Sequence, residues 1–269
     1  MISVINNVAS LTAENALAST QASLQNTLTE LSTGMRLTSG ASDPAALSVA
    51  NGLGANISAL TQSSQNATDG IGLLQTADGA LSQVTTLLNQ AVTIATEASN
   101  GGLTTAQLSA ADAEFTSIKN EITQIGSTTN FNGVAVFSSA AQDVYTTDGT
   151  SGTTTSTSIG TLSASGLSLT GSLTSASGAQ AALTTIISAI STVAATRGTI
   201  GASVNQLNAD TGVANTEVSN LTNAQNNIQN ADIGQTVSQM TQYNVLEQTG
   251  MAALQQSNAA AQNVLKLLQ

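Results

Sequence analysis

The chain has no cysteine and no histidine among its 269 residues. These absences remove thiol nucleophiles, imidazole acid–base chemistry, disulfides and the usual ligands of transition metals. The sequence also has no glycine-rich phosphate loop and no nucleophile with a base partner. The acidic pair Asp112 and Glu114 is two positions apart on a predicted helix, so the two carboxylates point to different faces. We therefore expect no enzymatic activity, no cofactor and no metal.

Basic residues are also scarce. Arg36, Lys119, Arg197 and Lys266 stand against 15 acidic residues, which gives a net charge of −11. Nucleic acids and anionic membrane surfaces both require clustered lysine and arginine, so neither is expected as a partner. The N-terminus has no basic segment before Arg36, and no run of about 18 apolar residues is found. If the protein lies outside the cell, we expect it to leave by a route other than general secretion.

Aromatic residues make up only 2% of the chain, whereas hydrophobic residues make up 41%. A core of leucine, isoleucine, valine and alanine favours closely packed helices. The longest pattern runs from Asp43, a predicted helix N-cap before Pro44, to Asn100. Its apolar positions recur every seven residues: Leu53, Leu60, Ala67, Leu74, Leu81, Leu88 and Ala95. Such a helix would be about 84 Å long and needs packing partners along its whole length.

Four other helices or helical segments are predicted. Residues 2–35 and 233–269 are amphipathic terminal helices, and a shorter helix after Thr104 returns antiparallel to the long one. Residues 183–232 form a second long helix of nearly equal length, which predicts that the two long helices pair. Arg197 occupies an apolar seam position there, so a buried guanidinium would need a partner among Asp43, Asp69 or Asp78.

The middle of the chain has a different pattern. Residues 130–137 alternate with period two, which places Val134 and Val136 on one face and Ala135 and Phe137 on the other. A second strand is predicted around residues 143–147, with Asp148 and Gly149 as a turn. Residues 146–177 are rich in serine, threonine and glycine. We interpret them as an exposed, β-rich loop region that carries no core, and a surface for O-linked sugars is the alternative.

These elements predict a mostly α fold. It is a long antiparallel helical hairpin or coiled-coil bundle, with a small β-rich insert and paired termini. Three domains are expected: residues 1–42 with 233–269, residues 43–137 with 178–232, and the insert 138–177. The uncovered apolar stripes of the terminal helices predict association with further copies of the chain.

Three stretches of the sequence resemble a known protein family. The stretch LSTGMRLTSGASDPAALSVANGLGANISALTQSSQNATDGIGLLQTADGAL (31–81) resembles the N-terminal signature of bacterial flagellin, as does TTNFNGVAVF (128–137). The C-terminal stretch from Ser219, ending in NVLKLLQ, is similar to the flagellin C-terminus. The resemblance implies a structural subunit of the extracellular flagellar filament. It also implies export, unfolded, by the flagellar type III route and contacts with an export chaperone, the filament cap and hook-associated proteins.

The terminal stripes and the resemblance together give candidate subunit-packing residues. These are Leu17, Leu24, Leu31, Arg36, Arg197, Val237, Met240, Leu246, Leu254, Leu265 and Leu268. For Arg36 and Arg197, a solvated charge beside the seam is an equally weighted interpretation.

The resemblance also identifies a receptor-facing stretch. Many flagellins have a Q-R-x-R-E-L-A sequence there, which an animal Toll-like receptor recognises. This chain has Asn89, Gln90 and Thr93 in the matching stretch, so both arginines and the glutamate are missing.

Two alternatives to a filament subunit remain. A hook–filament junction protein resembles flagellin at both ends. A soluble coiled-coil adaptor would instead form a discrete oligomer.

Overall fold

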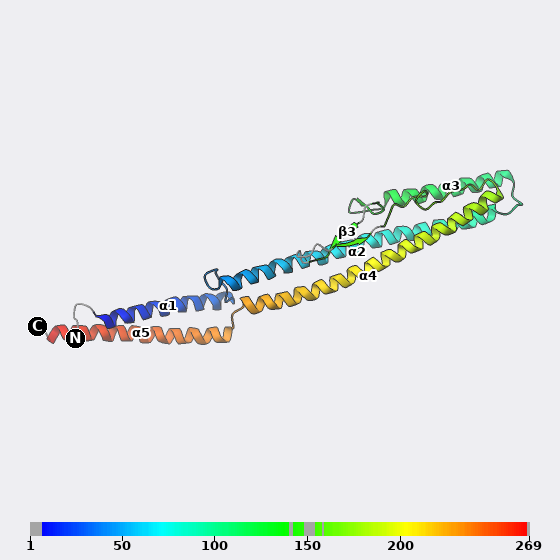
Figure 1. Cartoon of the computed structure of the whole chain (residues 1–269). Coiled ribbons are helices and arrows are strands. Elements are labelled where there is room, and N and C mark those ends of the chain that lie inside the picture. Colours follow the sequence, from blue (N-terminus) through cyan, green and yellow to red (C-terminus); the bar gives the residue numbers. More distant parts are fainter. Residues whose placement is uncertain (1–6, 140–141, 148–153, 158, 268–269) are drawn as a thin grey trace. The chain divides into compact units, whose positions relative to one another are not determined.

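The computed structural model describes residues 7–139, 142–147, 154–157 and 159–267. Within these ranges the chain forms five helices: α1 (Val8–Thr33), α2 (Pro44–Ala98), α3 (Thr105–Thr128), α4 (Ala176–Gln229) and α5 (Ile233–Leu267). Four short strands lie between α3 and α4: β1 (Asn130–Phe131), β2 (Val134–Ala135), β3 (Gln142–Tyr145) and β4 (Thr154–Thr157). Figure 1 shows this order along the chain. The predicted mostly α fold is confirmed.

The helix starts follow their predicted capping chemistry. The Asp43 carboxylate accepts a hydrogen bond from the backbone N–H of Ala46 at 2.9 Å, at the start of α2. Thr104 caps α3 in a capping box with Gln107, each side chain bonding to the other residue's backbone N–H. Sequence therefore predicts where α2 and α3 begin.

The chain divides into two compact units. The first contains residues 1–55 and 221–269, and the second contains residues 56–220. Both long helices contribute residues to both units. These boundaries differ from the three predicted domains, which stay a prediction.

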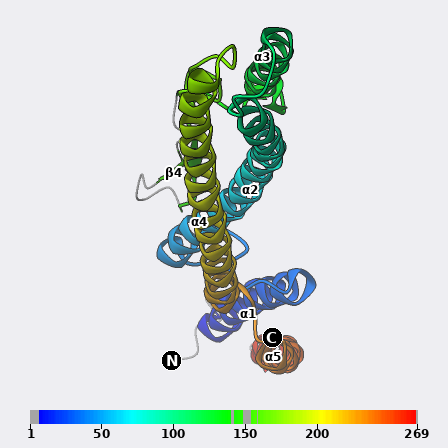
Figure 2. The same ribbon diagram turned by 90° about the vertical axis from the view of Figure 1, so that its right-hand side faces the viewer.

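In the second unit, α2, α3 and α4 lie side by side around one apolar core (Figure 2). The seam predicted for α2 is confirmed there, because Leu60, Ala67, Leu74, Leu81, Leu88 and Ala95 are all buried. α3 contributes Phe115, Ile118 and Ile122, and α4 contributes Ile186, Ala189 and Val193. Heptad spacing thus places one apolar face of each helix in the core.

Residues 159–173 form a loop that we call the core-facing loop, and here the sequence-based prediction is wrong. Although the surrounding region is polar in composition, the loop buries five apolar side chains in the core: Ile159, Leu162, Leu167, Leu169 and Leu173. It runs antiparallel to α3, because the N–H of Ala164 donates to Thr123 and the N–H of Leu173 donates to Asp112. Five apolar residues among serines and threonines have neither helical nor strand periodicity, so the pattern gave no signal.

Gly126 shows how closely this loop approaches α3. A Cβ atom at this position would lie 1.9 Å from the carbonyl oxygen of Leu162. The loop therefore requires glycine at residue 126.

The two hairpins are short. β1 pairs antiparallel with β2, with Asn130 opposite Ala135, and β3 pairs antiparallel with β4, with Val144 opposite Thr155. The alternation predicted for residues 134–137 is wrong: Val134 and Ala135 are exposed, whereas Val136 and Phe137 are both buried. Strand β2 ends at Ala135, after which the chain turns toward the core. The predicted turn at Asp148 and Gly149 lies outside the described residues.

Candidate functional site

The terminal helices α1 and α5 pack antiparallel in the first unit (Figure 1). Polar side chains link residues 7–21 to residues 247–258. Asn7 donates to the Ser257 carbonyl at 3.3 Å, Ser10 donates to the Asn258 side chain at 3.2 Å, and Gln21 donates to Glu247 at 3.2 Å. Leu17 lies against Gly250 between these links. The prediction that the terminal helices pair is confirmed.

No apolar side chain described in α1 or α5 is fully buried. The buried residues described in α1 and α5 are hydroxyl side chains: Ser10, Thr27 and Thr236. Large apolar side chains remain exposed along the pair: Val8, Leu11, Leu28, Ile233, Val237, Val245, Leu246 and Met251. Fully burying one such side chain contributes about 1.5 to 3 kcal/mol, so this surface favours coverage by another molecule.

The predicted packing residues occupy two environments in this pair. Leu17, Leu24, Leu31, Met240 and Leu254 are half-buried, and Val237 and Leu246 are exposed. The side chain of Leu265 and all of Leu268 lie outside the described residues. Whether copies of the chain contact these residues stays a prediction.

Next to the helix pair, the α1–α2 connection is bonded to the α4–α5 connection. The N–H of Arg36 donates to the Gln229 carbonyl at 2.7 Å, and the N–H of Ala231 donates to the Gly34 carbonyl at 3.0 Å. The Arg36 guanidinium donates to the Ile228 carbonyl at 3.1 Å, where helix α4 ends. A cation there is favoured by the free carbonyls and the helix dipole. Arg36 is thus exposed and bonds the α1–α2 connection to the end of α4, whereas its predicted role between subunits stays a prediction. Sequence reasoning missed the carbonyl partner, because a backbone acceptor leaves no pattern.

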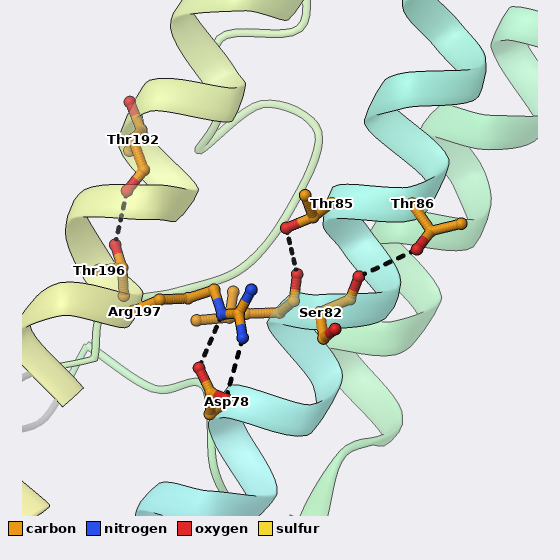
Figure 3. Close-up of polar contacts among 8 residues, drawn as sticks. Asp78, Ser82, Thr85, Thr86, Thr192, Thr196 and Arg197 are labelled. Carbon is orange, nitrogen blue, oxygen red and sulfur yellow. Dashed lines mark hydrogen bonds and ion pairs between the residues drawn. The ribbon is translucent and has the colours of Figure 1, made fainter. Parts of the chain in front are cut away.

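Arg197 pairs with Asp78, one of the three predicted partners (Figure 3). Nε lies 2.7 Å from Oδ1 and Nη2 lies 3.1 Å from Oδ2, which is a bidentate arrangement. The side chains are 37% and 41% exposed, so the guanidinium is not buried. The hydrogen bond from Arg197, with its charge attraction, lowers the pKa of Asp78 against the opposing effect of partial burial. The pair links α2 to α4 within the second unit.

The receptor-facing stretch of α2 presents uncharged polar side chains. Asn89, Gln90 and Thr93 are exposed. The neighbouring residues Leu88 and Ala91 are buried. The helix therefore keeps its packing, and these three exposed side chains carry no charge.

Among the described residues, no group of three or more histidine, cysteine, aspartate or glutamate side chains is placed to hold a metal ion. Helix α4 contains an 18-residue stretch with a mean hydropathy of 1.4, enough by length and composition to cross a membrane. The sequence analysis considered only unbroken apolar runs and therefore did not identify this stretch. The same helix packs Ile186, Ala189 and Val193 into the core of the second unit.

The fold and the exposed helix pair define a class of mostly helical proteins. In this class the first and last helices pack together and leave apolar side chains exposed. Comparisons with known proteins identify the family. Residues 4–142 match the model of the bacterial flagellin N-terminal helical region, and residues 183–268 match that of the bacterial flagellin C-terminal helical region. The chain belongs to the flagellin family.

Individual relatives agree. The chain is 42% identical over 140 residues to flagellin from Serratia marcescens, a match that covers 52% of this chain and 40% of that protein. It is 40% identical over 144 residues to flagellin from Salmonella muenchen, covering 53% of this chain and 28% of that protein. The chain thus spans less than half the length of these two relatives. The crystal structure of Bacillus cereus flagellin aligns with a TM-score of 0.50 and 25% identity, covering 55% of this chain and 88% of that one.

Proposed function

We propose that this chain is a structural subunit of a flagellar filament, located outside the cell, and that it polymerises through α1 and α5. One observation carries the proposal. The helix pair exposes large apolar side chains on both helices, and its fully buried side chains among the described residues are hydroxyl groups. Copies of the chain packed through these helices would bury the exposed stripes. Family membership supports this function.

The remaining parts of the proposal rest on the family alone. They are export of the unfolded chain by the flagellar type III route and contacts with the export chaperone, the filament cap and hook-associated proteins. The absence of histidine and cysteine supports a structural role over catalysis.

Seeded polymerisation tests the proposal. Purified chain is mixed with short filament seeds, and growth is followed by electron microscopy. We expect elongation of the seeds, and we expect Leu246→Ser combined with Val237→Ser to slow it. Ile187→Ser combined with Val213→Ser, at exposed apolar side chains of the second unit, is the matched control. A discrete oligomer with no seeded growth would instead support the adaptor.

The number of copies of the chain per flagellum distinguishes a filament subunit from a hook–filament junction protein. A junction protein is present in few copies per flagellum, whereas a filament subunit is its main component. Quantifying the chain in isolated flagella distinguishes the two.

A further inference from the structure

A hollow of about 300 Å³ lies on the second unit, where β3 and the end of β1 rest on α2. We call it the α2 groove. Its apolar walls come from Leu73, Leu74, Phe131 and Val144, and its polar rim includes Asp69 and Asp143. A neighbouring hollow shares Asp69, Leu73 and Phe131 and extends past the exposed side chain of Val134. The groove therefore combines an apolar floor with carboxylates at its rim.

Contacts within the second unit fix the walls in place. Ser63 on α2 donates to the Thr147 carbonyl at 2.6 Å, and Asn66 donates to the Tyr145 carbonyl at 3.4 Å. Val144 lies so close to Gly70 that a Cβ there would be 2.7 Å from Val144 Cγ2. The β3 side of the groove is thus held by hydrogen bonds and by a close approach that glycine permits.

The rim carboxylates lack a cationic partner in the part of the chain that the structure describes. Asp69 accepts one hydrogen bond, from Gln65 at 3.2 Å, and no ion pair reaches either Asp69 or Asp143. None of the described residues that line the groove is basic. Two exposed carboxylates beside apolar walls are complementary to a side chain that carries positive charge on an apolar stem.

A second copy of the chain is poorly suited to supply that charge. Of the four basic residues, Arg197 is paired with Asp78, Arg36 donates to the Ile228 carbonyl, and the side chain of Lys266 lies outside the described residues. The Lys119 ammonium lies 4.6 Å above the ring of its own Phe115. Each basic side chain that the structure describes thus already has a partner. Using one in the groove would cost an existing contact.

We propose that the α2 groove binds a segment of a different protein in which an arginine or lysine stands next to an apolar side chain. The apolar side chain would lie on Leu73 and Phe131, with the cation between Asp69 and Asp143. The volume suits one or two side chains, at the small end of the range for ligand pockets. This inference is independent of the filament proposal, because the groove uses no residue of α1 or α5.

Two peptides that differ only in charge test the proposal. Acetyl-Phe-Arg-Leu-amide is titrated into the ¹⁵N-labelled full chain at low salt, and acetyl-Phe-citrulline-Leu-amide is its neutral isostere. We expect saturable shifts of the amides of residues 69, 73, 131 and 143–145 with the arginine peptide. We expect at least about tenfold weaker binding of the citrulline peptide, because a lost charged contact commonly costs that much.

Two pairs of substitutions in the chain provide a second test of the groove. Asp69→Asn with Asp143→Asn should weaken binding of the arginine peptide about tenfold or more. Glu97→Gln with Glu114→Gln changes the net charge equally at exposed positions and should leave binding unchanged. Both pairs should keep the helical circular dichroism and thermal midpoint of the parent, since all four residues are exposed.

Several results would overturn the proposal: no saturable shifts, shifts outside the groove, equal affinity for both peptides, or equal weakening by both variant pairs. Slower seeded growth of the Asp69→Asn and Asp143→Asn variant would instead assign the groove to a second copy. Failure of seeded growth in the parent chain would count against the filament proposal alone.

Discussion

At the residue scale, single polar side chains specify the alignment of helices that apolar seams alone do not determine. Arg197 interrupts the apolar positions of α4 where α2 presents Asp78, and the two form a bidentate pair. Arg36 binds a helix-end carbonyl. Helices of leucine and alanine can slide by a heptad with modest loss, so such pairs help specify their alignment.

The Asp78–Arg197 pair should stabilise the fold in a pH-dependent way. Because the folded-state pKa of Asp78 is lowered from 3.8, its contribution is fully present above that pH and is lost as the pH falls through the folded value. We expect Asp78→Asn to reduce the free energy of unfolding by at most about 1 kcal/mol at neutral pH, since the pair is half-exposed. Urea unfolding of both proteins across pH measures this.

The control is a double-mutant cycle with Arg197→Gln. The two single losses should be similar, and the double variant should lose less than their sum. A stability difference between parent and Asp78→Asn that persists well below pH 3.8 would show that the ion pair is not its source.

Gly126→Ala should destabilise the second unit. The new methyl group would overlap the Leu162 carbonyl, and overpacking of this kind costs about 1 to 3 kcal/mol or more. Gly79→Ala is the matched control: its Cβ meets nothing within 4 Å, so it should stabilise helix α2 by about 0.5 to 1 kcal/mol. Chemical denaturation gives both values. Equal effects of the two substitutions would mean that the loop does not lie against α3.

At the element scale, periodic segments were predictable and aperiodic ones were not. The heptad of Leu60, Leu74 and Leu88 and the Asp43 cap placed α2 to within about two residues. The core-facing loop was missed, because burial of Leu162 and Leu173 depends on the surface that α3 and α4 present. The partner of Arg197 could be narrowed to three aspartates, and only the packed helices select Asp78.

Leu173→Ala tests the core-facing loop directly. Leu173 is fully buried, so removing its side chain should cost about 2 to 5 kcal/mol of unfolding free energy. Val213→Ala, at a side chain that is 65% exposed, should change stability by no more than about 0.5 kcal/mol. If the loop did not contribute to the core, both substitutions would reduce the free energy of unfolding by equally small amounts.

The receptor-facing stretch of α2 should activate the animal Toll-like receptor weakly. Asn89, Gln90 and Thr93 are exposed and uncharged where the resemblance places charged contacts. Losing one hot-spot arginine commonly costs about 2 kcal/mol or more, so two independent losses predict at least a roughly hundredfold drop in potency. Reporter cells titrated with purified monomer provide the measurement. Potency equal to that of a flagellin with the full motif would show that the receptor reads other residues here.

At the scale of the whole molecule, apolar burial is distributed unequally between the two units. The second unit encloses a continuous core that includes Leu81, Phe115 and Ile186, whereas α1 and α5 bury chiefly Ser10, Thr27 and Thr236. Ordering a residue costs about 1 to 2 kcal/mol of conformational entropy, and no fully buried apolar side chain offsets this cost among the described residues of the helix pair. We infer that the pair reaches full stability only when other copies cover it.

Hydrogen exchange on monomer and seeded filament tests that inference most directly. In the monomer, we expect the backbone amides of residues 240–260 to exchange much faster than those of residues 183–207, which lie in the core-bearing unit. In the filament, we expect residues 240–260 to become as protected as residues 183–207. Equal protection of the two segments in the monomer, or no gain by residues 240–260 on polymerisation, would contradict assembly through the terminal helix pair.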